Sequence, residues 1–169
     1  EELLGPEGPQ SIAVSWPYRP KSQPEHVTFR IPPVDAPNVD GARLLGLVPG
    51  PADDPPRAAD LSSLRAAVEA GRIVALYVFD PGPEGSLGGT QWILDARLAG
   101  KLPLLVVQGV LHTELARSAD LVLPGAAFIE KEAAYTNDQG RLQGTSPAMA
   151  PPGQAMDDWQ ILRNLGVAL

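Results

Sequence analysis

Polar and charged side chains gather between Thr136 and Gln143, where the sequence reads Thr-Asn-Asp-Gln-Gly-Arg-Leu-Gln. Two interpretations stay open. Either the stretch binds a ligand, or it is a long structured excursion that covers the edge of a sheet.

The polar stretch follows a short apolar run, Leu121 to Leu123, which is succeeded by Pro124. Proline cannot donate to a sheet ladder, so we expect this strand to end at Leu123. In an open α/β sheet, ligands and interfaces lie on the loops that follow the carboxyl ends of strands. Both interpretations of the polar stretch fit this position.

A second candidate is the glycine- and proline-rich loop from Asp80 to Gly89, which precedes a predicted helix. Backbone N–H groups at a helix N-terminus can hold an anion, so the segment Gly85–Thr90 supports the hypothesis of a free-standing nucleotide- or anion-binding α/β domain. The glycines match neither the dinucleotide fingerprint nor the Walker loop. Pro81 and Pro83 also remove two donors. The alternative is a plain turn.

No self-contained catalytic set is visible in the sequence. His26 and His112 are far apart, and no acidic cluster joins either of them to form a metal site. No serine lies in a G-x-S-x-G elbow. We therefore predict no catalytic residue and no metal ligand in this chain.

The composition excludes several classes of protein. The chain has 169 residues, a formal net charge of −7 and no cysteine. The charge disfavours nucleic acid as a partner. The lack of cysteine excludes disulfides, cysteine-ligated iron–sulfur clusters and thiolate metal sites within this chain. The longest apolar run, Ile73 to Phe79, is too short for a bilayer, so we predict no direct membrane insertion and an intracellular location.

The elements that must position these residues fall into two parts. Residues 1–59 contain 12 of the 19 prolines, so this segment should hold little helix. We expect one or two short strands there, over Ser11–Trp16 and Val27–Ile31, and one or two helical turns between Asn38 and Gly46.

From residue 60 onward, helical and strand patterns alternate. We expect a helix capped by Asp60 and ended by Gly71, a strand Ile73–Phe79, a helix between Thr90 and Gly100, a strand Leu104–Val107, a short helix Thr113–Ser118, the strand Leu121–Leu123, and a last helix from Asp157 to about Gly166. The strands are apolar on both faces, as in parallel sheets. Residues 60–169 therefore predict a βαβαβ domain, a Rossmann-like parallel sheet with helices on both faces.

The chain also resembles the molybdopterin oxidoreductase superfamily. The matching residues are Ala119 to Pro124 (Ala-Asp-Leu-Val-Leu-Pro), Glu130-Lys131, Asn137, Gly140-Arg141 and Gln143, against a family pattern A-D-x-V-L-P followed by E-K-x-G-T-x-x-N-x-E-G-R-x-Q. Val106-Val107-Gln108 and Thr113-Glu114 are similar to the family's V-x-Q and T-E-T, which precede this motif. The resemblance extends from about Asn38 to Leu165.

The tail of the chain resembles one branch of that superfamily. Pro151 to Ala155 (Pro-Pro-Gly-Gln-Ala) and Asp158 to Leu162 (Asp-Trp-Gln-Ile-Leu) are similar to P-P-G-E-A and D-W-x-I-L of the large iron–sulfur subunit of NADH–quinone oxidoreductase, complex I. This resemblance implies a C-terminal fragment that acts as a scaffold and assembly domain. It implies a parent that is an NADH dehydrogenase (quinone) with iron–sulfur clusters outside this fragment, whereas the fragment itself holds no cofactor and is not catalytic.

The complex I resemblance also implies partners and a location. The partners are the other peripheral-arm subunits and the rest of the parent subunit, and the location is cytoplasmic, at the inner membrane through the parent complex. The alternative implied by the superfamily is a portion of a molybdenum or tungsten oxidoreductase that binds molybdopterin.

Two departures from the family pattern bear on that alternative. Ala133-Ala134 replaces the family's Gly-Thr, and Phe79-Asp80-Pro81-Gly82 replaces a G-x-N-P turn, which weakens the case for a bound pterin. If a pterin is bound, the residues nearest to candidate contacts are Thr136, Asn137, Gly140, Arg141 and Gln143. Otherwise, we expect Arg141 to pair with a carboxylate such as Glu130 and brace the loop.

Overall fold

The computed structural model describes residues 12–15, 24–28, 38–48, 60–79, 82, 89–137 and 139–169. The chain divides into two compact units. One contains residues 1–59 and Ala134–Gly144, and the other contains Asp60–Ala133 and Thr145–Leu169. Within the described ranges, none of the helices has the length and apolar character needed to cross a membrane.

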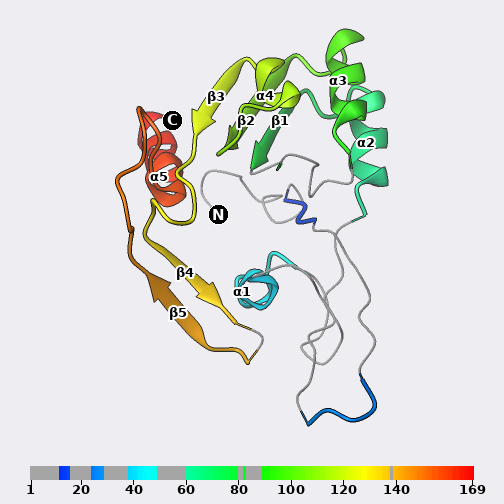
Figure 1. Cartoon of the computed structure of the whole chain (residues 1–169). Helices are drawn as coiled ribbons and strands as arrows, with labels where there is room; N and C mark the ends of the chain where they lie inside the picture. Colours follow the sequence, from blue (N-terminus) through cyan, green and yellow to red (C-terminus); the bar gives the residue numbers. More distant parts are fainter. Residues whose placement is uncertain are drawn as a thin grey trace. The chain divides into compact units, whose positions relative to one another are not determined.

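The larger unit is built on a parallel sheet of three strands, β1 (Ala75–Phe79), β2 (Leu104–Gly109) and β3 (Leu121–Pro124), in the order β1-β2-β3 (Figure 1). Its helices are α2 (Ser62–Glu69), α3 (Gln91–Leu98), α4 (Glu114–Arg117) and α5 (Asp158–Ala168). The predicted α/β class is therefore confirmed.

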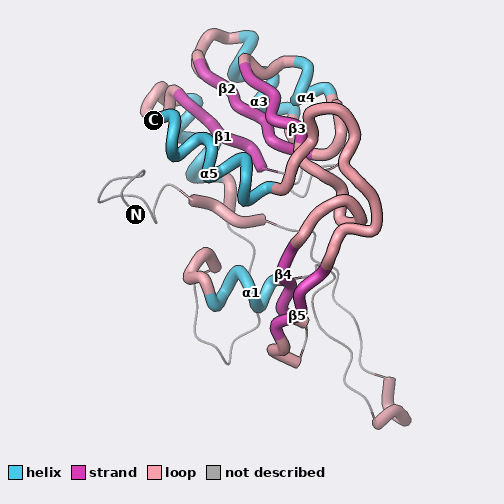
Figure 2. The backbone as a smooth tube through the Cα atoms, turned by 90° about the vertical axis from the view of Figure 1, so that its left-hand side faces the viewer, coloured by secondary structure: helices cyan, strands magenta, loops and turns pink. Residues whose placement is uncertain are grey.

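The core of this unit lies on one face of the sheet. Leu105 and Val107 of β2 are almost fully buried there, together with Val68, Val78, Ile93, Ala96, Leu102, Leu115 and Ala116. These residues come from α2, α3, α4 and the strands, so the three helices share one apolar layer. Side chains alternate along β2, which places Gln108 on the opposite face. Helix α5 lies on that side of the sheet, away from α2 and α3 (Figures 1 and 2).

Some element ends differ from the sequence-based expectations. Pro124 belongs to β3 and pairs with Gly109, because β3 lies at the end of the strand order, where a missing N–H is tolerated. Helix α2 begins at Ser62 with Leu61 as its N-cap, yet Asp60 still accepts a hydrogen bond from the Ser62 N–H at 2.9 Å. Helix α5 continues past Gly166 to Ala168.

Asp120 joins three elements at the amino end of the sheet. Its Oδ2 accepts a hydrogen bond from the Leu105 N–H at 2.7 Å, and its Oδ1 accepts one from Arg97 Nη2 at 2.8 Å. These hydrogen bonds, the backbone one foremost, lower the pKa of the Asp120 carboxyl below its usual value because they favour the charged form. The start of β3 is thereby tied to β2 and α3.

The smaller unit contains α1 (Val39–Leu44), where one or two helical turns were predicted. Asn38, at the N-cap, has a left-handed φ of 62°, and its Oδ1 accepts a hydrogen bond from the Thr136 N–H at 2.8 Å. The strand predicted over Ser11–Trp16 is absent from its described part, residues 12–15. Most of Val27–Ile31 lies outside the described residues.

A two-stranded sheet that the sequence did not predict joins β4 (Ala133–Thr136) to β5 (Leu142–Thr145). These strands contain the two ends of the polar stretch, Thr136 in β4 and Gln143 in β5. The expected long excursion is therefore a hairpin, and its short, largely exposed strands explain why no apolar pattern indicated it.

Candidate functional site

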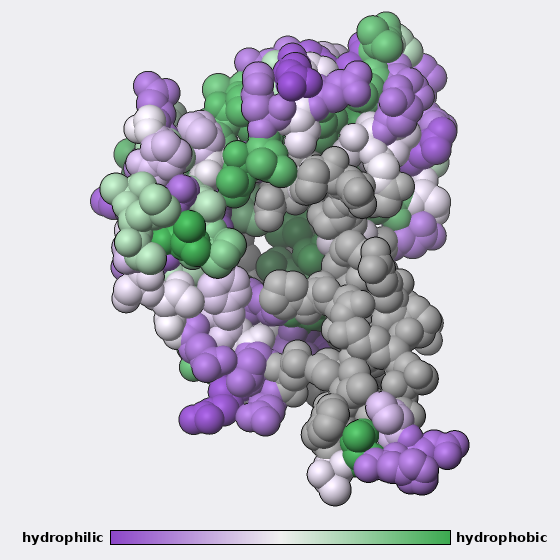
Figure 3. All heavy atoms as spheres, viewed as in Figure 1, coloured by the Kyte–Doolittle hydropathy of each residue, from purple (hydrophilic) through white to green (hydrophobic). Residues whose placement is uncertain are grey.

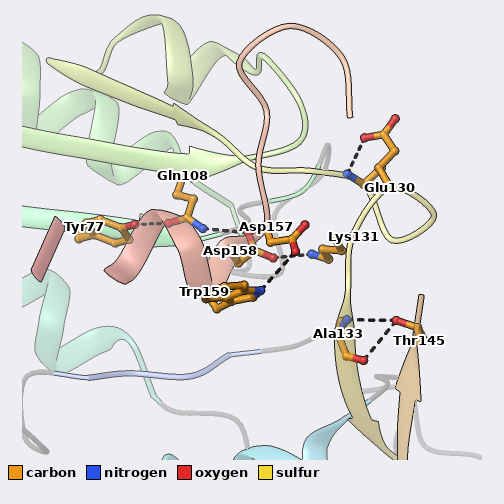
Figure 4. A network of polar contacts seen from close by, with 10 residues as sticks. Tyr77, Gln108, Glu130, Lys131, Ala133, Thr145, Asp157, Asp158 and Trp159 are labelled. Carbon is orange, nitrogen blue, oxygen red and sulfur yellow. Dashed lines mark hydrogen bonds and ion pairs between the residues drawn. The ribbon is translucent and has the colours of Figure 1, made fainter. Parts of the chain in front are cut away.

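A chain of four polar side chains lies near the carboxyl ends of β1 and β2 (Figure 4). The Tyr77 hydroxyl donates to Gln108 Oε1, and Gln108 Nε2 donates to Asp158 Oδ1 at 2.8 Å. The other oxygen of Asp158 forms an ion pair with the Lys131 ammonium. This set of contacts, which we call the Tyr77–Lys131 polar chain, joins two strands to the start of α5 and to the segment after β3.

Burial sets the electrostatics of the polar chain. Gln108 is 0% exposed, so its carboxamide would cost free energy without the two partners that it has. Desolvation raises the pKa of the Tyr77 hydroxyl, and the negative charge of Asp158 raises it further. The polar chain therefore keeps Tyr77 neutral and holds the first turn of α5 against the sheet.

The backbone after β3 approaches this site closely. The Gly125 N–H donates to Gly109 O at 3.0 Å, and the Met156 N–H donates to Pro124 O at 3.2 Å. A Cβ on Gly125 would lie 3.0 Å from Asp158 Oδ1. A side chain there would press on the carboxylate at the centre of the polar chain, so glycine suits this position.

The sequence-predicted residues Thr136, Asn137 and Gly140 are engaged in the structure of the hairpin. Thr136 is 4% exposed, and its N–H is bound by Asn38. Asn137 Oδ1 accepts hydrogen bonds from the N–H groups of Gln139 and Arg141, at 3.0 and 2.9 Å. Gly140 has a φ of 73°, which a residue without Cβ adopts readily. These three residues shape the turn.

Arg141 and Gln143, the other two predicted residues, have exposed side chains. Within the described ranges, the guanidinium of Arg141 makes no hydrogen bond or ion pair. Its planar fork of donors suits a phosphate. The donor set therefore fits a phosphate-bearing cofactor at these two positions, while Asn137 holds the backbone of the turn.

Glu130, the proposed partner of Arg141, makes a local contact. Its Oε2 accepts a hydrogen bond from the Ala127 N–H at 2.9 Å, which closes the turn after β3. Glu130 and Arg141 belong to different units of the chain. Their ion pair stays a prediction.

The structure adds little on the other two sequence candidates, the loop Asp80–Gly89 and His112. Most of the loop Asp80–Gly89 lies outside the described residues, and His112 is exposed. Among the described residues, no group of three or more histidine or acidic side chains converges on a metal-binding geometry.

Sequence reasoning missed the polar chain at the sheet edge. Asp158 is 50 residues from Gln108 along the sequence, so no local spacing connects them. The available signal was Gln108 itself, a polar residue directly after the apolar run Leu104–Val107. A polar side chain in a buried strand requires a partner.

Comparison with known proteins gives a match to one family model and relatives that align with part of this chain. The model of the family Molybdopterin oxidoreductase matches residues 56–168. The F420-dependent formate dehydrogenase subunit alpha of Methanocaldococcus jannaschii is 44% identical over 68 residues, which are 40% of this chain and 10% of that protein. The NADPH-Fe(3+) oxidoreductase subunit alpha of Geobacter sulfurreducens is 37% identical over 106 residues, 63% of this chain and 12% of that protein.

A solved structure agrees at the level of the fold. Acetylene hydratase from Pelobacter acetylenicus aligns with a TM-score of 0.53 and 22% identity, over 66% of this chain and 16% of the other. The chain spans about a tenth of the length of the formate dehydrogenase and NADPH-Fe(3+) oxidoreductase subunits that it matches. The predicted superfamily is confirmed, whereas the assignment to complex I stays a prediction.

Proposed function

We propose that this chain, which belongs to the molybdopterin oxidoreductase family, is part of a longer oxidoreductase subunit and helps that subunit to bind a molybdopterin cofactor. The similar formate dehydrogenase and NADPH-Fe(3+) oxidoreductase subunits support an oxidoreductase as the parent. The observation that supports cofactor binding is the exposed Arg141, presented on a turn that Asn137 holds.

The residues of this chain would bind and orient the cofactor. A bound molybdopterin supplies the metal centre at which a substrate is oxidised or reduced. Arg141 would hold a phosphate group through two N–H groups of its guanidinium. Gln143 would offer a carboxamide that donates and accepts hydrogen bonds. Asn137 and Gly140 would keep the turn in the conformation that presents Arg141.

The test is the pterin content of the full-length parent, purified from its native host. Pterin is measured by fluorescence after oxidation and identified by mass spectrometry. We expect stoichiometric pterin in the wild type and a large loss in Arg141→Ala. Arg163→Ala, an exposed arginine of α5 outside the motif, is the matched control and should keep its pterin. Equal pterin content in Arg141→Ala and wild type would refute the role of Arg141.

A second candidate function is the scaffold of the large iron–sulfur subunit of NADH–quinone oxidoreductase. The observation that favours it is the Tyr77–Lys131 polar chain, whose groups near the strand ends are paired with one another. In this proposal the parent carries iron–sulfur clusters, meets other peripheral-arm subunits and lies at the cytoplasmic face of the inner membrane. A native parent that contains iron–sulfur clusters but no pterin would favour the scaffold.

A further inference from the structure

A depression of about 560 Å³ opens on the larger unit, beside the start of α5. Its lining includes Glu130, Asp157, Gln160, Met149, Met156 and Pro151. We propose that this depression is a docking site for a partner protein, and that the partner inserts an arginine carried on an apolar segment of its chain. None of the five residues predicted to contact a cofactor lines it, so the docking site is independent of the proposed function.

The charge of the depression selects a cation. Two of its lining residues are charged, Glu130 and Asp157, and both are acidic. The neighbouring Asp158 is balanced by its ion pair with Lys131 (Figure 4). The N-terminus of α5 adds only about half a positive charge, so two carboxylates outweigh it. The net charge of −7 for the whole chain acts in the same direction at long range.

Both carboxylates have an oxygen to offer. Glu130 uses Oε2 for the Ala127 N–H. Asp157 is the N-cap of α5 but makes no capping hydrogen bond, and its Oδ2 accepts only from Trp159 Nε1 at 3.2 Å. Within the described ranges, neither Glu130 Oε1 nor Asp157 Oδ1 accepts a hydrogen bond. These two oxygens, with the carboxamide of Gln160, are acceptors for a cationic donor.

The rim of the depression is apolar, which favours a polypeptide over a small cation. Met149 is 54% exposed on its lining, and Phe128 and Ile129 are 75% and 40% exposed next to Glu130 in the sequence. The Ala148 N–H donates to Ile129 O at 2.8 Å, so Ile129 adjoins the lining. Hydrophobic residues also stand out at the surface of this unit in Figure 3.

Arginine matches this combination of groups better than lysine does. Its guanidinium presents five N–H donors in a planar fork, a geometry that matches carboxylates. Its aliphatic stem packs on methionine and proline while the charged head reaches the carboxylates. The apolar residues beside the arginine would cover the exposed Phe128 and Ile129. Arginine and apolar anchors are enriched at protein–protein interfaces.

The two methionines of the chain make the test selective, because Met149 and Met156 are its only methionines and both line the depression. The full 169-residue chain is labelled with ¹³C in the methionine methyl groups. The probe is the peptide acetyl-Ala-Leu-Arg-Leu-Ala-amide, and its control replaces arginine with neutral citrulline. We expect saturable shifts of both methyl resonances with the arginine peptide. The citrulline peptide should bind about tenfold more weakly, because its ureido group keeps N–H donors but lacks the positive charge that strengthens their bonds to carboxylates.

Variants locate the interaction. Glu130→Gln and Asp157→Asn should each weaken binding of the arginine peptide, while the matched control Glu132→Gln, outside the lining, should not. Circular dichroism checks the fold of each variant, and if one variant fails to fold the other still tests the site. Fluorescence anisotropy of a labelled peptide gives the affinity independently of the methyl spectra.

Several results would overturn the proposal. One is equal binding of the arginine and citrulline peptides, and another is equal weakening by Glu132→Gln and Glu130→Gln. Free arginine amide that binds as tightly as the peptide would assign the depression to a small cation. If the methionine methyl shifts change when the chain is diluted without peptide, the depression binds a second copy of this chain. A longer parent that no longer binds the peptide would assign it to the parent's own chain, which also overturns a separate partner.

Discussion

Replacing Gln108 with methionine tests whether the Tyr77–Lys131 polar chain stabilises the larger unit. Methionine has a similar length, so the change removes hydrogen bonds without opening a large cavity. Gln108 is fully buried, donates to the Asp158 carboxylate at 2.8 Å and accepts from the Tyr77 hydroxyl. The polar chain loses its central member in Gln108→Met.

The expected cost follows from these contacts. A hydrogen bond to a charged group contributes roughly 1.5–3 kcal/mol. The bond to Tyr77 contributes less, about 0.5 kcal/mol, because Tyr77 is 39% exposed and its hydroxyl can bond to water instead. Removing a buried carboxamide in favour of an apolar side chain returns about 1 kcal/mol. We therefore expect Gln108→Met to lower the free energy of unfolding by about 2 kcal/mol.

Urea unfolding followed by circular dichroism measures this change. With a slope of about 1–3 kcal/mol per molar urea, the midpoint should fall by roughly 1 M while the slope stays constant. Tyr77→Phe, which removes only the outer bond and leaves the buried Gln108 Oε1 without it, is the matched control and should cost less, about 1 kcal/mol. A loss below about 0.5 kcal/mol in Gln108→Met, or equal losses in both variants, would refute the reasoning that the Gln108–Asp158 bond dominates.

Three further predictions concern other groups. The pKa of Tyr77 is raised in the folded state, so its contribution to stability is complete below its unfolded pKa near 10. This contribution disappears as pH rises through the folded value. The free energy of unfolding should therefore fall more steeply from pH 8.5 to about 11.5 in the wild type than in Tyr77→Phe. The pKa of Asp120 is lowered in the folded state, so its contribution to stability is present above its unfolded pKa and disappears as pH falls through the folded value. When the free energy of unfolding is measured during acid titration, Asp120→Asn should therefore lose less stability than the wild type. Identical profiles would contradict this. A Cβ in Gly41→Ala would lie 2.2 Å from Asn38 Oδ1, which should displace the carboxamide and break its hydrogen bond with the Thr136 N–H. Hydrogen exchange at the Thr136 amide should then become faster. Unchanged exchange would show that the carboxamide moves aside with its hydrogen bond intact.

Much of the fold follows from local patterns in the sequence. The strand Leu104–Val107 is predicted because it is apolar on both faces, and the structure extends it to Gly109. The short helix predicted over Thr113–Ser118 is α4, and the Thr113 hydroxyl caps it by accepting from the Ala116 N–H at 3.2 Å. These signals are local, since a strand period or a helix cap needs only neighbouring residues.

The hairpin and the polar chain were not predictable in the same way. Leu142–Thr145 is exposed along its whole length, so no burial pattern marks β5 as a strand. The turn signal was present, because Asn137 and Gly140 are residues that favour turns. The polar chain depends on contacts between residues that are distant in sequence, such as Gln108 and Asp158, and only the folded backbone brings these together.

The hydrogen bond from Thr136 to Asn38 also constrains the order of folding during synthesis. The two residues are 98 positions apart, and the segment between them includes the three strands of the parallel sheet. At about 5–20 residues per second, a ribosome needs roughly 5–20 s to produce Thr136 after Asn38. The N-cap of α1 therefore emerges long before its partner, and the smaller unit can be completed only after β1, β2 and β3 have been translated.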